Sequence, residues 1–334
     1  MSDVVWVVAG LAGLVTGGDL LVRGAVALAQ RLGVSPLIIG LTLVGFGTST
    51  PELVASLQAA LAGSPGLAIG NVVGSNIGNI LLILGLAALL SPIRVDPAAL
   101  RRDGAVMALA ALICTWAILE GTLGRATGAG FLGLLALYLV LTVMIERRSM
   151  SAAAALYRAE ADLVTPAEPS ASSVLKTGPK SGPNTGLLRP VLTVLAGLVL
   201  TILAARALVT GAIGLAATAG VSETAIGLTV VALGTSLPEL VTSLVAVRRG
   251  QGDVAFGNIV GSNIFNVLGI LGTTAMVLPL EVPAQVASFD IWVMLAATLA
   301  LAVFAATGQR IDRREGAVLV TAYGGYLATL ALTA

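Results

Sequence analysis

The sequence predicts an all-α integral membrane protein with ten transmembrane helices, arranged as two inverted repeats of five helices each. Three observations predict this fold class. The chain of 334 residues is 57% hydrophobic and only 10% charged, whereas about 25% of an average soluble domain is charged. Apolar stretches of about 20 residues, long enough to cross a bilayer, recur along nearly the whole chain. A pair of polar motifs in the first half occurs again in the second half.

The apolar stretches give the ten helices in order. The first stretch has no basic residue before Arg23, which favours a retained helix over a cleaved signal peptide. A single cysteine, Cys114, excludes an internal disulfide. The predicted helices are residues 4–28, 35–61, 67–90, 104–120, 127–145, 190–217, 222–246, 254–279, 288–307 and 315–333.

One long polar segment, residues 147–189, divides the chain. It is rich in alanine, serine, proline and glycine with scattered charge, a composition typical of a flexible linker. The predicted organisation is therefore an N-terminal five-helix repeat (1–146), a flexible cytoplasmic linker (147–189) and a C-terminal inverted five-helix repeat (190–334).

The basic residues predict the orientation. Alternate loops carry fifteen lysines and arginines, while the opposite set of loops carries only Arg125. Positive charge marks cytoplasmic loops, so both termini are expected outside and the central loop in the cytoplasm. These residues then require no nucleic-acid partner. The arginine, alanine and leucine bias indicates a bacterial inner (plasma) membrane.

An internal repeat relates the two halves at an offset of 187 residues. GLTLVGFGTSTPELVASL (40–57) matches GLTVVALGTSLPELVTSL (227–244) at 13 of 18 positions. GNVVGSNIGNILLILG (70–85) matches GNIVGSNIFNVLGILG (257–272) at 12 of 16 positions. Because each half has an odd number of helices, the second must enter the membrane from the opposite face, as in many secondary transporters.

Each repeat places one carboxylate in the middle of an apolar span, Glu52 or Glu239. A charge near the bilayer centre is costly, so such a residue indicates a functional site. A structural ion pair is the alternative, but no lysine or arginine lies within a few residues of either glutamate. Pro51 and Pro238 are expected to open the helices around residues 45–47 and 232–234, which frees carbonyl oxygens that can bind a cation.

Hydroxyl and amide side chains surround these glutamates in the sequence. Thr48 and Ser49 precede Glu52 by four and three residues, so both can share its helix face. In the following helix, polar residues recur every four positions; interhelical hydrogen bonding is the alternative role, above all for Asn71, Asn76, Asn258 and Asn263. The two polar stripes are Asn71, Ser75 and Asn79 in the first repeat, and Asn258, Ser262 and Asn266 in the second.

Every candidate ligand is an oxygen atom. This chemistry suits calcium, sodium or magnesium and argues against zinc or copper, since the chain contains no histidine and its cysteine lies outside the motifs. A metalloprotease of the HExxH type is excluded for the same reason. Two facing glutamates would compensate one divalent or two monovalent ions, and competition for the same oxygens would couple the two ion types.

At these motifs the chain resembles the cation/calcium exchanger (CaCA) superfamily. GTSTPE with GSNIGN, and GTSLPE with GSNIFN, are similar to the motifs of the prokaryotic sodium/calcium exchangers. The resemblance implies that helices 2, 3, 7 and 8 form a core across which the long helices 1 and 6 slide. It implies calcium and sodium ligands Glu52, Glu239, Thr48 and Thr235, sodium ligands Ser49, Ser236, Ser75, Ser262, Gly45 and Ala232, and Asn79 and Asn266 in the middle of the site.

Two departures narrow the expected ions. Some relatives that also move potassium have aspartate where Asn266 stands, so potassium dependence is not expected. The proton/calcium branch replaces GTSxPE with a glycine-asparagine motif, so the GTS motifs favour sodium. Outside the motifs, Asp19 is expected to pair with Arg23 or with Arg206, a structural role rather than one in ion passage.

The sequence thus predicts a sodium/calcium antiporter that alternates access around a midplane site with two glutamates. It predicts no enzyme activity, no cofactor and no protein partner; the partners are calcium, sodium and the lipid bilayer. A proton/calcium or other divalent cation antiporter of the same fold is the alternative, because burial disfavours a charged carboxylate and a proton could replace sodium. A cation channel is a further alternative.

Overall fold

The computed structural model describes residues 2–163, 186–218 and 234–333. Within these residues, nine helical segments are long and apolar enough to cross a membrane, and each matches a predicted span. Of the predicted span 222–246, the described part contains α13 (Leu237–Arg248). The all-α membrane fold is therefore confirmed.

The first half follows the predicted order. Its first and fifth spans lie in α1 (Ser2–Leu32) and α9 (Arg125–Leu163). The other three spans contain π-helical turns, labelled η. They are α2 (Pro36–Ile39), η1 (Gly40–Val44), α3 (Gly45–Thr48) and α4 (Thr50–Leu61); then α5 (Pro65–Gly78), η2 (Asn79–Leu84) and α6 (Gly85–Leu90); then α7 (Pro97–Ala99), η3 (Leu100–Gly104) and α8 (Ala105–Leu119).

The second half has the same plan. It begins with α10 (Leu188–Thr218) and ends with α17 (Arg313–Thr333). Between α13 and α17 lie α14 (Gly252–Ile264), η5 (Phe265–Leu271) and α15 (Gly272–Val277), followed by η6 (Val286–Asp290) and α16 (Ile291–Gly308).

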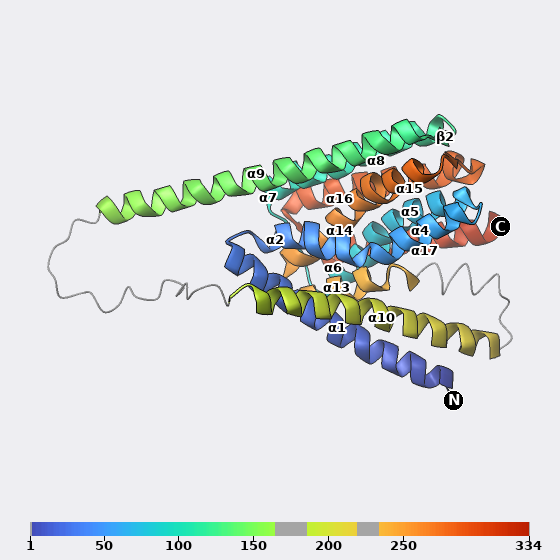
Figure 1. Ribbon diagram of the computed structural model, residues 1–334, viewed down its shortest axis with the longest axis horizontal. Coiled ribbons are helices and arrows are strands. Elements are labelled where there is room, and N and C mark those ends of the chain that lie inside the picture. The colour runs from blue at the N-terminus through green and yellow to red at the C-terminus, as the bar shows by residue number, and fades with distance from the viewer. Residues whose placement is uncertain (1, 164–185, 219–233, 334) are drawn as a thin grey trace.

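The helix α9 continues beyond the span expected to end at residue 145. It reaches Leu163, so the expected linker, residues 147–189, begins within a helix. Figure 1 shows this end of α9 reaching away from the bundle on the side opposite to both chain ends. The division of the chain into two repeats and a linker stays a prediction.

Two long helices lie along one side of the bundle. α1 and α10 each have 31 residues and run next to each other (Figure 1). Glycines allow this close approach. A Cβ atom on Gly197 of α10 would lie 2.4 Å from the backbone nitrogen of Leu21 in α1, and one on Gly17 would lie 2.7 Å from the backbone nitrogen of Thr201.

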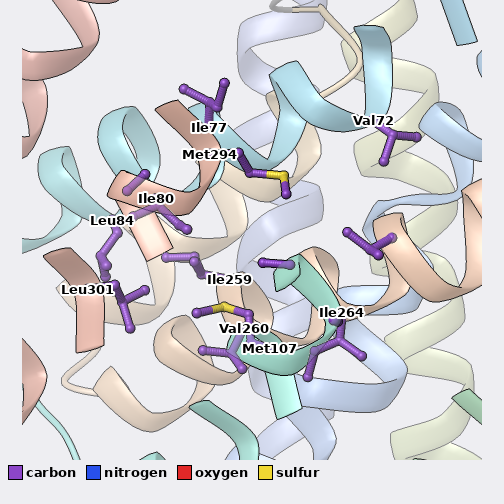
Figure 2. Packing of buried hydrophobic residues seen from close by; sticks show 14 of the residues in the cluster. Val72, Ile77, Ile80, Leu84, Met107, Ile259, Val260, Ile264, Met294 and Leu301 are labelled. Carbon is purple, nitrogen blue, oxygen red and sulfur yellow. The ribbon is translucent and has the colours of Figure 1, made fainter. Parts of the chain in front are cut away.

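The remaining helices enclose an apolar core. In the most apolar 18 residues of the span Gly252–Val277, 94% of the residues are buried, compared with 28% in the span of α1. α14 and η5 therefore lie at the centre of the bundle. Figure 2 shows the packing of residues from α5, η2, α8, α14 and α16, among them Val72, Ile80, Met107, Ile259 and Met294. The motif helices are thus held in the interior of the protein.

Two short strand pairs connect the halves crosswise. β1 (Ile93–Arg94) pairs antiparallel with β4 (Arg310–Ile311), and β2 (Thr122–Leu123) pairs antiparallel with β3 (Leu280–Glu281). Each pair takes one strand from each half. Residues 93 and 280, and residues 123 and 310, differ by the repeat offset of 187, so the strand pairing follows the internal repeat.

Candidate ion-binding site

The two glutamates lie in the first turns of α4 and α13. Each helix has its motif proline in the first two positions, where proline fits without losing a hydrogen bond. The interruption falls at Ser49 (φ −80°, ψ 7°), later than the expected residues 45–47, because Pro51 starts a new helix instead of bending the old one. Ser236 has the same conformation (φ −90°, ψ 6°), and the expected opening at 232–234 lies mostly outside the described residues.

The glutamates and serines of the two motifs pair across the repeats. Ser49 Oγ donates to Glu239 Oε1 at 2.9 Å, and Ser236 Oγ donates to Glu52 Oε1 at 3.1 Å. Both glutamates are 1% exposed. The structure therefore brings the two predicted carboxylates into one buried site, in which each serine hydrogen-bonds to the carboxylate of the opposite repeat.

The site contains buried oxygen atoms without hydrogen bonds. In the described part of the chain, seven buried side-chain oxygens have no hydrogen-bond partner. Such atoms are rare, because burying an unpaired polar group is costly. Five belong to predicted ligands, and the other two to Thr242 and Asn263. The five are Glu52 Oε2, Glu239 Oε2, Asn79 Oδ1, Asn266 Oδ1 and Thr235 Oγ1. This donor set fits a hard cation.

The remaining predicted ligands lie in the same region. Ser262 Oγ donates to the carbonyl of Gly45 at 3.1 Å, and Thr48 Oγ1 lies 3.3 Å from the same carbonyl oxygen. Ser236 Oγ is 3.5 Å from Ser75 Oγ. The carbonyl of Gly45 is thus already hydrogen-bonded, and Ala232 lies outside the described residues.

The asparagines divide into two groups. Asn71 and Asn258 hydrogen-bond to the glutamate-bearing helices of their own repeats. Asn266 Nδ2 donates to Asn76 Oδ1 at 3.3 Å, and Asn76 Nδ2 lies 3.6 Å from Met294 Sδ. These contacts are of the interhelical kind expected for Asn71, Asn76 and Asn258. The same expectation for Asn263 is wrong, because its Nδ2 donates to the carbonyl of Ile259 in its own helix at 2.7 Å.

Asp19 has an additional partner. It pairs with Arg23 at 2.9 Å, as expected, and also with Arg249, which follows α13. Arg206 is exposed, and no contact between it and Asp19 is present among the described residues. The pair with Arg249 links α1 to the end of a glutamate-bearing helix.

Several buried polar residues near the site were not predicted from the motifs. Ser56 and Ser243, each four residues after a glutamate, accept hydrogen bonds from the asparagines. Their repetition at the same offset was the available signal. Asp103 and Asp290, which are separated by the repeat offset of 187 residues, were also not predicted as polar contacts. Tyr138 Oη donates to Asp103 at 3.2 Å, and Tyr326 Oη donates to Asp290 at 3.1 Å.

Comparison with known proteins identifies the family. The family model described as sodium/calcium exchanger protein matches residues 2–144 and 189–332. The chain belongs to the sodium/calcium exchanger family. It is 38% identical over 327 residues to the inner membrane protein YrbG of Escherichia coli, covering 97% of this chain and 94% of that protein. It is 34% identical over 339 residues to the sodium/calcium exchanger MaX1 of Methanosarcina acetivorans, covering 96% of each.

Solved structures agree with this assignment. The sodium-calcium exchanger NCX_Mj, in a crystal soaked with zero Na+ and Ca2+, superposes with a TM-score of 0.82 and 30% sequence identity. The match covers 98% of this chain and 99% of that one. The exchanger family member described here is therefore an integral membrane transporter of the cation antiporter class and not an enzyme.

Proposed function

We propose that this family member exchanges sodium for calcium across the membrane by alternating access around the buried pair Glu52 and Glu239. The observation that carries the proposal is the crossed pairing of the two motifs, which gathers two carboxylates and several unpaired oxygens in one buried place. The names of the relatives MaX1 and NCX_Mj support the choice of ions.

The charge of the site explains how ions would be coupled. Two ionised carboxylates compensate one Ca²⁺ or two Na⁺ ions. A buried site whose charge is uncompensated is costly to move through the bilayer centre. The protein then changes its access only when one ion type or the other is bound, and the two types exchange because they compete for Glu52 and Glu239.

The other residues take supporting parts in this proposal. Thr48 and Thr235 join the glutamates in the calcium site, and Asn79 and Asn266 complete its middle through unpaired amide oxygens. The flanking sodium ligands are Ser49, Ser236, Ser75, Ser262 and the carbonyl oxygens of Gly45 and Ala232.

The proposed setting is a bacterial inner membrane, as the name of the relative YrbG supports. Both termini lie outside and residues 147–189 lie in the cytoplasm, because the basic loops mark the cytoplasmic side. Figure 1 supports a common side for the termini, since both chain ends lie at the same end of the bundle.

Calcium-45 uptake into proteoliposomes tests the proposal. Vesicles loaded with sodium, vesicles with an outward proton gradient and vesicles with neither are compared. Uptake driven only by sodium is the expected result. Uptake driven only by protons would keep the glutamates and replace the coupling ion, and uptake that fails to saturate at carrier rates would indicate a channel.

A further inference from the structure

Each glutamate-bearing helix is held to the next helix by one asparagine. In the first repeat, Asn71 of α5 donates through Nδ2 to the backbone carbonyl of Glu52 at 3.4 Å and to Ser56 Oγ at 2.9 Å. An amide nitrogen has two protons, so both are used. We call this arrangement the Asn71 clamp.

The second repeat contains the same arrangement. Asn258 of α14 donates through Nδ2 to the carbonyl of Glu239 at 3.3 Å and to Ser243 Oγ at 2.9 Å. Ser56, Ser243 and Asn258 are fully buried. The Asn258 clamp therefore repeats the Asn71 clamp to within 0.1 Å (3.4 against 3.3 Å, and 2.9 Å in both).

We infer that Asn71 and Asn258 are positioning residues, which fix the carboxylates of Glu52 and Glu239 by holding the backbone of those same residues. The inference rests on the proposed function and deepens it. Because Ser49 interrupts the chain between α3 and α4, the first turn of α4 is not continuous with α3, and Ser236 has the same non-helical conformation before α13. A lateral tie at the glutamate itself supplies the precision that a coordination site needs.

One contact distinguishes the two clamps. Thr48 Oγ1 of the first repeat donates to Asn258 Oδ1 at 3.2 Å. No corresponding hydrogen bond from its counterpart, Thr235, to Asn71 is present among the described residues. Asn258 thus joins the glutamate of one repeat to a predicted ligand of the other, and its loss should disturb the site more than the loss of Asn71.

Purified full-length protein in detergent allows the test. Calcium affinity and the thermal midpoint without added ions are measured for Asn71→Ala and Asn258→Ala. The milder variants Ser56→Ala and Ser243→Ala each remove one acceptor and leave the asparagine in place. The matched control is Thr298→Ala, which removes a buried hydroxyl that donates only within its own helix, to the carbonyl of Met294 at 2.9 Å.

The expected result separates positioning from general stability. Asn71→Ala should weaken calcium binding about tenfold, the effect of a lost buried hydrogen bond, and Asn258→Ala should weaken it further. The serine variants should lose about threefold in affinity. The asparagine variants lose two hydrogen bonds each and should lower the ion-free midpoint more than Thr298→Ala, which loses one. Thr298→Ala and the wild type should have the same calcium affinity, so the loss of affinity in the asparagine and serine variants is the readout of positioning.

Two results would overturn the inference. The first is that the asparagine variants bind calcium as tightly as Thr298→Ala. The second applies if the asparagine variants do not fold, and is that Ser56→Ala and Ser243→Ala bind calcium with wild-type affinity. A wild-type protein that binds sodium but not calcium would remove calcium from the proposed function alone, and the same variants compared in sodium would still decide the clamps. A wild-type protein that binds neither ion would overturn both proposals.

Discussion

Replacing either glutamate by glutamine should abolish calcium transport without unfolding the protein. Glu52→Gln and Glu239→Gln keep the shape of the side chain and the oxygen that accepts from Ser236 or Ser49. Each removes one of two buried carboxyl groups, and with it one negative charge that a bound calcium ion would face. Unit charges about 4 Å apart interact by about 4 kcal/mol at an effective dielectric constant of about 20. The loss in calcium affinity is then roughly a thousandfold or more.

The stability of the ion-free protein should change in the opposite direction. A neutral amide is less costly to bury than a carboxylate, so the thermal midpoint without ions should stay the same or rise. The assay is sodium-driven calcium-45 uptake in proteoliposomes, beside thermal unfolding in detergent. Glu281→Gln, at an exposed position in β3, is the control and should transport normally. Calcium uptake at the wild-type rate by either motif variant would refute the two-glutamate site.

Three further outcomes are expected. Asp19→Asn should slow transport, because it removes the ion pair with Arg249 that links α1 to the end of α13, and it should leave the relative affinities for sodium and calcium unchanged. The pair is partly exposed, so its loss should cost at most about 1 kcal/mol of unfolding free energy. A changed selectivity would contradict this structural role. Gly197→Ala should cost about 1–3 kcal/mol of unfolding free energy, since the new Cβ would lie 2.4 Å from the backbone nitrogen of Leu21. The control is Gly133→Ala, whose Cβ would meet no atom within 4 Å and should not destabilise the protein. Equal thermal midpoints for the two variants would contradict the close packing of α1 against α10. Backbone N–H groups of Glu315 and Arg314 hold the pKa of Asp312 below its ordinary value, so this N-terminal cap of α17 stabilises the protein at neutral pH. The contribution decreases as the pH falls below about 4 and through the lowered pKa. Asp312→Ala should therefore lower the midpoint at about pH 7, and by less as the pH is lowered below about 4.

Hydropathy and the internal repeat predicted the architecture well. The expected span 35–61 corresponds to Pro36–Leu61 in the structure, and the expected span 190–217 to Leu188–Leu215. The extension of α9 could not be found in this way, because residues after 145 lose their apolar character while alanine, arginine and glutamate keep a high helix propensity. Strands of two residues show no periodicity that a sequence pattern can reveal.

The residues of the site were predicted better than the contacts between them. Spacing placed Ser49 and Glu52 on one helix face, which assumes an unbroken helix between them. The interruption at Ser49 removes that assumption, and the hydroxyl donates to Glu239 instead. Contacts between residues far apart in sequence, such as Asp19 with Arg249, leave no local pattern from which they could be predicted.

The crossed strand pairs have a consequence for how such a molecule can be built. A single five-helix half would contain one of the two glutamates, one member of each crossed serine contact and two strands without their partners. Two copies of one half, inserted in opposite directions, would supply every missing member. Two such copies would therefore carry the residue types of both motifs and both strand pairs, which the single chain holds in equal number.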